Sequence, residues 1–322
     1  MEEKAMNKGQ SVLFGIDDSD FARQALSEIG GLLKKNENLK ITVFHGVAEP
    51  DFSAFLESIG EEPRALEKYR ERWDLKARTV LEQAEEVLAE SGFDPGKTST
   101  VLDKKCGDPA DAMLKAADNE GIETIAVSRW GKSTISRKLI GSVTYRLVQS
   151  ADDLALWVID PRICSNNVLI GLVGAPISQR VVDYTVRYFS HLKESKFTFF
   201  HVIPPIPPQY WSSEDIKDME EDEKHEKIAR WLKEYTDKVK ATADDAKQKL
   251  VAAGVPERNV VFRFQPQQKG IARDILLELE QGNHGILVIG RRGYKDIREF
   301  GLGSKANKVL LSGRAFVICL VN

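Results

Sequence analysis

The chain contains one sequence pattern twice. The segment VLFGIDDSD (12–20) aligns with VLIGLVGAP (168–176), and ITVFHGV (41–47) aligns with FTFFHVI (197–203), both at an offset of 156 residues. A pattern repeated in this way predicts two copies of one structural unit.

Further along the chain the offset becomes 162, which pairs Gly92 with Gly254. The six added residues fall in a single connection, which is rich in proline in the second half (204–213). Length changes of this kind are tolerated in surface connections and not within packed elements. We therefore expect two domains of the same fold, over residues 1–162 and 163–322.

Length and composition narrow the class of protein. A chain of 322 residues, 42% apolar and 30% charged, has enough material for two globular cores. A net charge of −3 does not favour nucleic acid as a partner, and no apolar run approaches the roughly 20 residues that cross a bilayer. The polar first residues, and three cysteines too scattered for a disulfide framework, predict a cytoplasmic protein.

Each copy alternates strands with helices. In the first copy we expect strands near residues 11–16, 41–47, 98–103, 124–128 and 154–159. The intervening helices carry apolar residues at helical spacing, and the longest one ends at Gly92, or at Gly254 in the second copy, where a C-terminal cap belongs. Near-continuous apolar strands between helices predict an α/β fold, with a five-stranded parallel sheet and helices on both faces.

Several side chains recur in both copies. Aromatic pairs one turn apart lie on the long helices, Tyr69 with Trp73 and Trp231 with Tyr235. We interpret them as packing of these helices on the sheet. His45 and His201 end equivalent strands, which indicates a shared structural role and not catalysis. Cys106 precedes a turn into a helix, a position where a lowered thiol pKa is expected.

A glycine pattern follows the fourth strand of each copy. The second copy has Gly290 and Gly293, then nine residues, then Gly303-Ser304. The first copy has Ser128 and Gly131, then nine residues, then Gly141-Ser142. Glycine lets a ligand approach the main chain, and the N–H groups at the start of the next helix attract phosphate. The strand ends of an open parallel sheet are where ligands usually bind.

The complete pattern G-x2-G-x9-G-S within a duplicated α/β unit resembles the phosphate loop of the universal stress protein family, and the resemblance covers nearly the whole chain. The family fold is Rossmann-like, of the adenine nucleotide alpha hydrolase-like type. The resemblance implies that ATP or another adenine nucleotide is bound, with Mg²⁺ as a candidate companion. The residues it implicates are Asp17, Ser128, Gly131, Gly141, Ser142 and Val143 in the first copy, and Val202, Ile289, Gly290, Gly293, Gly303 and Ser304 in the second.

The two copies depart from the family pattern in different ways. The first keeps Asp17, which contacts the nucleoside in related proteins, but has Ser128 in place of a glycine and Gly46 in place of the adenine-side valine. Ser128 is tolerated there only if its backbone φ is negative. The second copy has every glycine but carries Val173 where the aspartate belongs. Arg291 and the basic residues after it add positive charge that could partly compensate.

Three functions remain open from the sequence. The first is a nucleotide-binding stress protein whose bound nucleotide alters its contacts with partner proteins. The second is a scaffold of degenerate domains that binds no nucleotide. The third, a slow ATP hydrolase, is disfavoured because no paired carboxylates or evident base accompany the loop. The resemblance also implies pairing of the last strands (154–159 and 315–320) within the chain, and a homodimer is a further candidate assembly.

Overall fold

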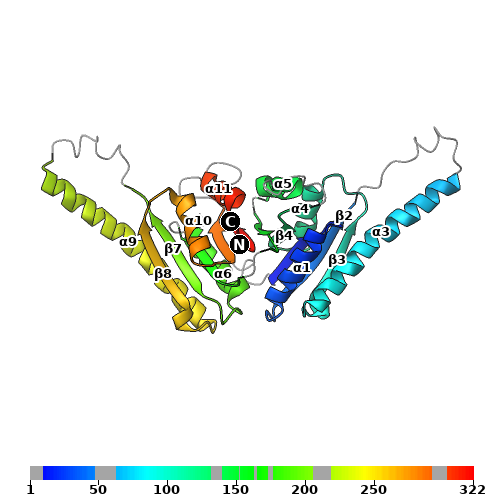
Figure 1. The fold of residues 1–322 in the computed structure, drawn as a ribbon, viewed down its shortest axis with the longest axis horizontal. Helices are drawn as coiled ribbons and strands as arrows, with labels where there is room; N and C mark the ends of the chain where they lie inside the picture. The colour runs from blue at the N-terminus through cyan, green and yellow to red at the C-terminus, as the bar shows by residue number, and fades with distance from the viewer. Residues whose placement is uncertain are drawn as a thin grey trace. The chain divides into compact units, whose positions relative to one another are not determined.

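A computed structural model describes residues 10–47, 63–131, 140–151, 153–162, 165–172, 177–205, 219–291 and 303–322. The chain divides into two compact units, one of Met1–Cys164 with Phe316–Cys319 and one of Ser165–Ala315 with Leu320–Asn322. Figure 1 colours the chain from blue through green to red, so that the repeated order of elements can be followed in each unit. The predicted α/β fold is confirmed in both units.

The first unit is a parallel sheet with the order β3-β2-β1-β4-β5. Its strands are β1 (Gln10–Gly15), β2 (Leu39–Gly46), β3 (Thr98–Asp103), β4 (Thr124–Ser128) and β5 (Ala155–Ile159). Its helices are α1 (Asp20–Leu33), α3 (Pro63–Glu90), the short η1 (Pro95–Lys97), α4 (Pro109–Asn119) and α5 (Ser142–Ser150). Helix α1 packs with α3 and α4 packs with α5, as expected when the chain winds outward from β1 in both directions.

The second unit repeats this arrangement. Its elements are β6 (Val168–Gly171), α6 (Ile177–Phe189), β7 (Phe197–Ile203), α9 (Glu221–Ala252), η2 (Glu257–Asn259), β8 (Val260–Pro266), α10 (Ile271–Gln281), β9 (Ile286–Gly290) and α11 (Ser304–Ser312). The last strand, β10 (Val317–Val321), contributes Leu320 and Val321 to this unit. Strand β6 pairs in parallel with β7 and β9, and β7 pairs in parallel with β8. The Arg291 N–H, just after β9, donates to the Val321 carbonyl of β10 at 2.7 Å.

Local sequence explains where the helices begin and end. The Ser19 hydroxyl caps α1 by accepting the Ala22 N–H at 3.2 Å, and the Asp108 carboxylate caps α4 in the same manner. The long helices α3 and α9 are followed by Gly92 and Gly254, whose φ angles are +86° and +88°. Both predicted C-terminal caps are therefore confirmed, and glycine is favoured because other residues are strained at positive φ.

The packing interpretation of the aromatic pair on α3 is wrong for Tyr69. Tyr69 is 49% exposed, whereas Ala77, Ala84 and Leu88 further along the helix are buried. A helix of 28 residues is about 42 Å long, but an eight-residue strand spans only about 26 Å. The amino-terminal half of α3 therefore extends past the strands it packs on, and α9 does the same in its own unit (Figure 1).

In α9 the aromatic pair stacks on itself, with Trp231 and Tyr235 ring centroids 5.4 Å apart. Tyr235 also contacts His201 of β7, at 5.5 Å between centroids. The packing interpretation therefore holds for Tyr235. No helix in the described ranges is both long and apolar enough to cross a membrane.

Candidate functional site

The chain turns sharply after the first strand of each unit, and the same contacts hold the turn in both. In the first unit the Ile16 N–H donates to the Phe44 carbonyl at 2.9 Å, and His45 Nδ1 lies 2.8 Å from the Ile16 carbonyl oxygen. In the second unit the Leu172 N–H donates to the Phe200 carbonyl at 2.9 Å, and His201 Nδ1 lies 2.8 Å from the Leu172 carbonyl oxygen. Each histidine thus joins the second strand to the turn after the first. The structural role predicted for this pair is confirmed.

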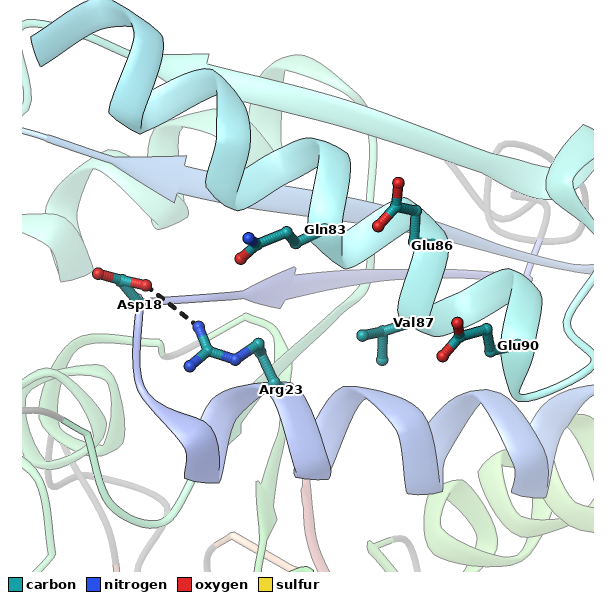
Figure 2. A pocket seen from close by; sticks show the side chains of 6 residues that line it. All are labelled: Asp18, Arg23, Gln83, Glu86, Val87 and Glu90. Carbon is teal, nitrogen blue, oxygen red and sulfur yellow. Dashed lines mark hydrogen bonds and ion pairs between the residues drawn. The ribbon is translucent and has the colours of Figure 1, made fainter. Parts of the chain in front are cut away.

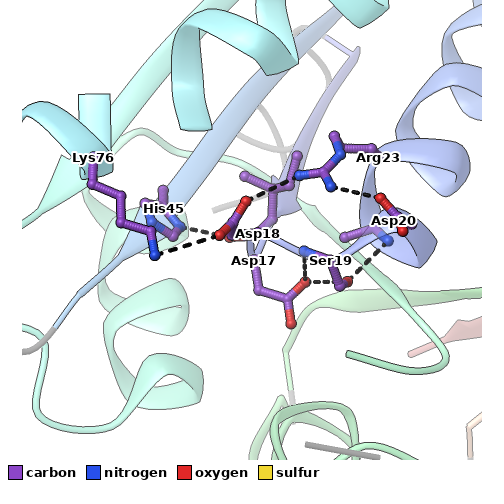
Figure 3. A network of polar contacts seen from close by, with 9 residues as sticks. Asp17, Asp18, Ser19, Asp20, Arg23, His45 and Lys76 are labelled. Atoms are coloured by element: carbon purple, nitrogen blue, oxygen red, sulfur yellow. Dashed lines mark hydrogen bonds and ion pairs between the residues drawn. The ribbon is translucent and has the colours of Figure 1, made fainter. Parts of the chain in front are cut away.

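Asp17 lies at this turn and faces the glycine loop of the first unit. Its Oδ1 accepts the Ser19 N–H at 3.1 Å and also the Ser19 hydroxyl, as Figure 3 shows. A Cβ placed on Gly131 would lie 2.5 Å from Asp17 Oδ2, so that any larger residue would push the carboxylate away. The structure therefore brings together two predicted site residues that are 114 positions apart in the sequence.

The end of the glycine loop has the same geometry in both units. The Gly141 N–H donates to the Arg129 carbonyl at 3.0 Å, and the Gly303 N–H donates to the Arg291 carbonyl at 3.0 Å. Gly141 has φ −59° and ψ 150°, and Gly303 has φ −58° and ψ 144°. Ser142 and Ser304 then open α5 and α11, and no side chain among the described residues caps either helix. Uncapped N–H groups and the positive end of the helix dipole suit an anion.

Ser128, at the end of β4, is 8% exposed. Among the described non-glycine residues only Asn283 has a positive φ, so the negative φ expected of Ser128 is confirmed. The Ser128 carbonyl accepts the Thr144 hydroxyl at 3.1 Å. The Ser128 hydroxyl has no hydrogen-bond partner in the part of the chain that the structure describes. A buried hydroxyl of this kind is a candidate contact for a bound polar group.

The absence of an adenine-side valine in the first unit has a steric cause. A Cβ on Gly46 would lie 2.7 Å from Cys106 Sγ and 3.0 Å from the Phe44 ring. Burial, together with Asp103 and Asp108, raises the pKa of the Cys106 thiol. The lowered thiol pKa expected from the sequence is therefore wrong, because Cys106 packs into a buried gap between acidic residues.

Trp130 lies between Ser128 and Gly131 of the first unit, at a position that the glycine spacing does not indicate. It is 3% exposed, and its ring centroid lies 5.8 Å from that of Phe21. The Arg162 guanidinium stands 4.0 Å from the same ring and is held by Asp160 through hydrogen bonds of 2.9 and 2.8 Å. The Trp130 Nε1 has no hydrogen-bond partner among the described residues. The signal in the sequence that points to Trp130 is a large aromatic residue among the polar and glycine residues of this loop.

The second unit shows its predicted residues less completely. Val202 and Ile289 are buried at the ends of β7 and β9, and Gly290 is half-buried. Gly293, Val173 and the basic residues Arg292, Lys295 and Arg298 lie outside the described residues. Arg291 is fully buried, and the compensating positive charge predicted for it stays a prediction. No group of three or more potential metal-binding side chains occurs within the described ranges.

The comparisons with known proteins agree with this architecture. The model of the universal stress protein family matches residues 9–153 and 165–318. A universal stress protein from Archaeoglobus fulgidus is 17% identical, with a TM-score of 0.63 and 98% of each chain covered. A putative universal stress protein from Pseudomonas aeruginosa is 13% identical, with a TM-score of 0.55 and coverage of 98% of this chain and 94% of that one.

A universal stress protein solved in complex with cAMP is 19% identical, with a TM-score of 0.33, and covers 48% of this chain and 99% of that chain. No curated protein matches the chain. The family model accounts for two successive segments, one in each of the two structural units. The chain therefore belongs to the universal stress protein family and carries two of its domains in tandem.

Proposed function

We propose that this protein binds an adenine nucleotide at the strand ends of its domains and acts through nucleotide-dependent contacts with partner proteins. The observation that carries the proposal is the contact between Asp17 and Gly131 beside the uncapped start of α5. A carboxylate that accepts hydrogen bonds from a nucleoside and a helix start that attracts phosphate lie in one place, as a nucleotide requires.

The residues of the first domain fit such a ligand. Ser142 and Val143 would hold phosphate through their N–H groups. Gly141, whose own N–H donates to the Arg129 carbonyl, and Gly131 would give the ligand close access to the main chain. The buried Ser128 hydroxyl, at the end of β4, has no hydrogen-bond partner within the described structure. Mg²⁺ would add positive charge beside the phosphates.

In the second domain the proposed contacts are Gly290, Gly293, Gly303 and Ser304 for phosphate, with Val202 and Ile289 on the adenine side. This domain keeps all the loop glycines, and the φ and ψ of Gly303 match those of Gly141 within a few degrees. It lacks the aspartate, which removes a hydrogen bond worth roughly 1.5–3 kcal/mol if charge-assisted. We propose that the second domain is the better phosphate site and the first the better nucleoside site.

Equilibrium binding of ATP, ADP and AMP to the full chain tests the proposal. Gly131→Val would displace Asp17 and is expected to weaken binding in the first domain, whereas Gly293→Val would obstruct the second. If both variants keep the wild-type affinity, or if no binding is measurable at millimolar ATP, the proposed site is wrong.

A scaffold without nucleotide is the second candidate, and one observation favours it for the first domain. Trp130, beside Gly131, is buried and contacts Phe21 and Arg162, so that this residue packs against protein. Partner binding that is unaffected by nucleotide would support this alternative. The boundary between residues 162 and 163, the pairing of the two domains, a homodimer and a cytoplasmic location also remain proposals.

A further inference from the structure

A buried histidine of the second unit lies just before β9, whereas the glycine loop follows that strand. The His284 side chain is fully buried, and neither ring nitrogen has a hydrogen-bond partner among the described residues. Glu278 of α10, itself buried, lies 3.7 Å from His284 Nε2 and is paired with Arg263 of β8 at 2.9 Å. A buried imidazole without a hydrogen bond destabilises the fold, so its presence indicates a role other than packing.

The first unit has apolar residues at the aligned positions. The places of His284, Glu278 and Arg263 are taken there by Ile122, Ala116 and Val101. The backbone of the turn is the same, since the Ile122 N–H donates to the Ala117 carbonyl at 2.8 Å and the His284 N–H donates to the Leu279 carbonyl at 3.0 Å. Because isoleucine occupies the same turn in the first unit, the fold does not require a histidine there.

The turn that carries His284 also holds the first residues of the second unit. The Asn283 carbonyl accepts the Ser165 hydroxyl at 2.7 Å and the Asn167 side-chain amide at 3.2 Å. The Asn167 carbonyl in turn accepts the N–H groups of Gly285 and Ile286, both at 3.0 Å. Ser165 approaches so closely that a Cβ on Gly285 would clash with its backbone. We call these hydrogen bonds the clasp, because they join the start of the second unit to the residues on both sides of the histidine.

A proton on His284 would place a positive charge in this interior. Burial, with smaller contributions from the positive charges of Lys196, just before β7, and Arg263, lowers the pKa of His284 to about 4. Glu278 is the acidic group that would balance the new charge, but both of its carboxylate oxygens already lie within 3.2 Å of Arg263 Nη1. The charged ring is therefore more stable in water than in the folded turn.

Charged side chains of the first unit gather instead on an open surface. Figure 2 shows the residues that line a groove between α1 and α3, namely Asp18, Arg23, Gln83, Glu86, Val87 and Glu90. Glu86 and Glu90 are exposed, so that water and salt screen a change in their protonation. His284 lacks this screening, and a single proton on its ring therefore acts on the contacts around it.

We propose that protonation of His284 opens the clasp, so that mild acid releases the start of the second unit while its core stays folded. The ring takes a proton from solvent and moves out toward water, which carries the Asn283 carbonyl away from Ser165 and Asn167. Release of Asn167 then exposes the N–H groups of Gly285 and Ile286. The clasp is separate from the glycine loop, and the proposal does not depend on nucleotide binding.

Native-state hydrogen exchange of the full chain, followed by NMR at pH 7 and pH 5, tests the proposal. The Gly285 and Ile286 amides should lose protection roughly twentyfold after correction for intrinsic exchange, because the open state binds a proton near pH 6.5 and the closed state only near pH 4. The Leu172 amide, which donates to the Phe200 carbonyl just past the other end of β6, should keep its protection. An equal loss at all three amides would mean that the whole unit unfolds, which overturns the clasp.

Three variants separate the buried histidine from a general effect of acid. His284→Ile installs the residue of the aligned turn in the first unit and should abolish the pH dependence while the chain stays folded. His225→Gln, at an exposed histidine, should keep the twentyfold change. Ser165→Ala removes one hydrogen bond of the clasp and should lower the protection of Gly285 at both pH values.

Three results contradict the proposal. One is a pH dependence that persists in His284→Ile, and another is unchanged protection of Gly285 in Ser165→Ala. The third is an NMR titration of the imidazole ring that gives His284 a pKa at or above the ordinary value of about 6.5, since the proton would then stabilise the closed turn.

Discussion

Buried histidines of this chain differ in what their ring nitrogens contact. His45 and His201 each place Nδ1 at 2.8 Å from a backbone carbonyl. His284, after α10, has a fully buried side chain, and neither ring nitrogen has a hydrogen-bond partner in the described part of the chain. Burial, with smaller contributions from Lys196 and Arg263, lowers the pKa of His284 to about 4. Glu278 is the acidic group beside it, 3.7 Å from Nε2.

We predict that His284 makes the protein sensitive to mild acid. The unfolded chain takes up a proton near pH 6.5 and the folded chain only near pH 4, so stability falls as the pH drops through this window. Between pH 7 and pH 5 the loss from this residue is roughly 1–2 kcal/mol. Urea unfolding at both pH values, for wild type and His284→Leu, measures it. Equal losses of stability in the two proteins would contradict the prediction, because they would show that the pKa of His284 is the same in the folded and unfolded chains.

At the scale of elements, each of the two long helices has a buried half and an exposed half. The carboxyl-terminal half of α3 buries Ala77, Ala84 and Leu88 against the unit, and that of α9 buries Val239 and Leu250. The amino-terminal halves extend past the strands, with Leu75 of α3 63% exposed. Helical periodicity is the same along the whole helix, so the pattern alone could not distinguish a packed turn from an extending one.

This division predicts unequal effects of the same substitution within α3. Leu88→Ala removes a fully buried side chain and should destabilise the protein by about 2–5 kcal/mol. Leu75→Ala, at an exposed position, should change stability by less than about 0.5 kcal/mol. Chemical denaturation monitored by circular dichroism compares them. A large cost for Leu75→Ala would mean that the extending half packs on something in solution.

At the scale of the whole molecule, the duplication reaches individual hydrogen bonds. The turn after the first strand, the histidine that holds it and the glycine before α5 and α11 have matching partners and distances in both units. The differences lie around this shared frame. In the first unit Trp130 contacts Arg162, and in the second Lys249 forms an ion pair with Asp183 at 2.8 Å. The units are therefore alike in their backbone and unlike in their surfaces.

The shared frame predicts matched responses to matched changes. His45→Phe and His201→Phe each remove one buried hydrogen bond to a carbonyl and leave it unpaired, at a cost of about 1–3 kcal/mol. Calorimetric unfolding of both single variants and the double variant measures the costs. We expect similar single effects that add in the double variant, because the two sites share no residues. Strong non-additivity would contradict this independence.

The sequence predicted only part of the candidate site, because the remaining contacts join residues that are far apart along the chain. The glycine spacing indicated Gly131 and Gly141, and the resemblance assigned Asp17, but only the fold brings Asp17 within contact of Gly131. The steric role of Gly46 against Cys106 depends on a residue sixty positions away, which no local pattern reveals.

The sequence by itself determined the tandem repeat, the order of strands and helices and the glycine caps at Gly92 and Gly254. These features are encoded locally, in apolar periodicity and in residues suited to one backbone conformation. The tertiary structure decided which positions along α3 are buried, and that Trp130 and Arg291 are interior. Those outcomes depend on side-chain volume and charge meeting across the fold, which spacing along the chain does not contain.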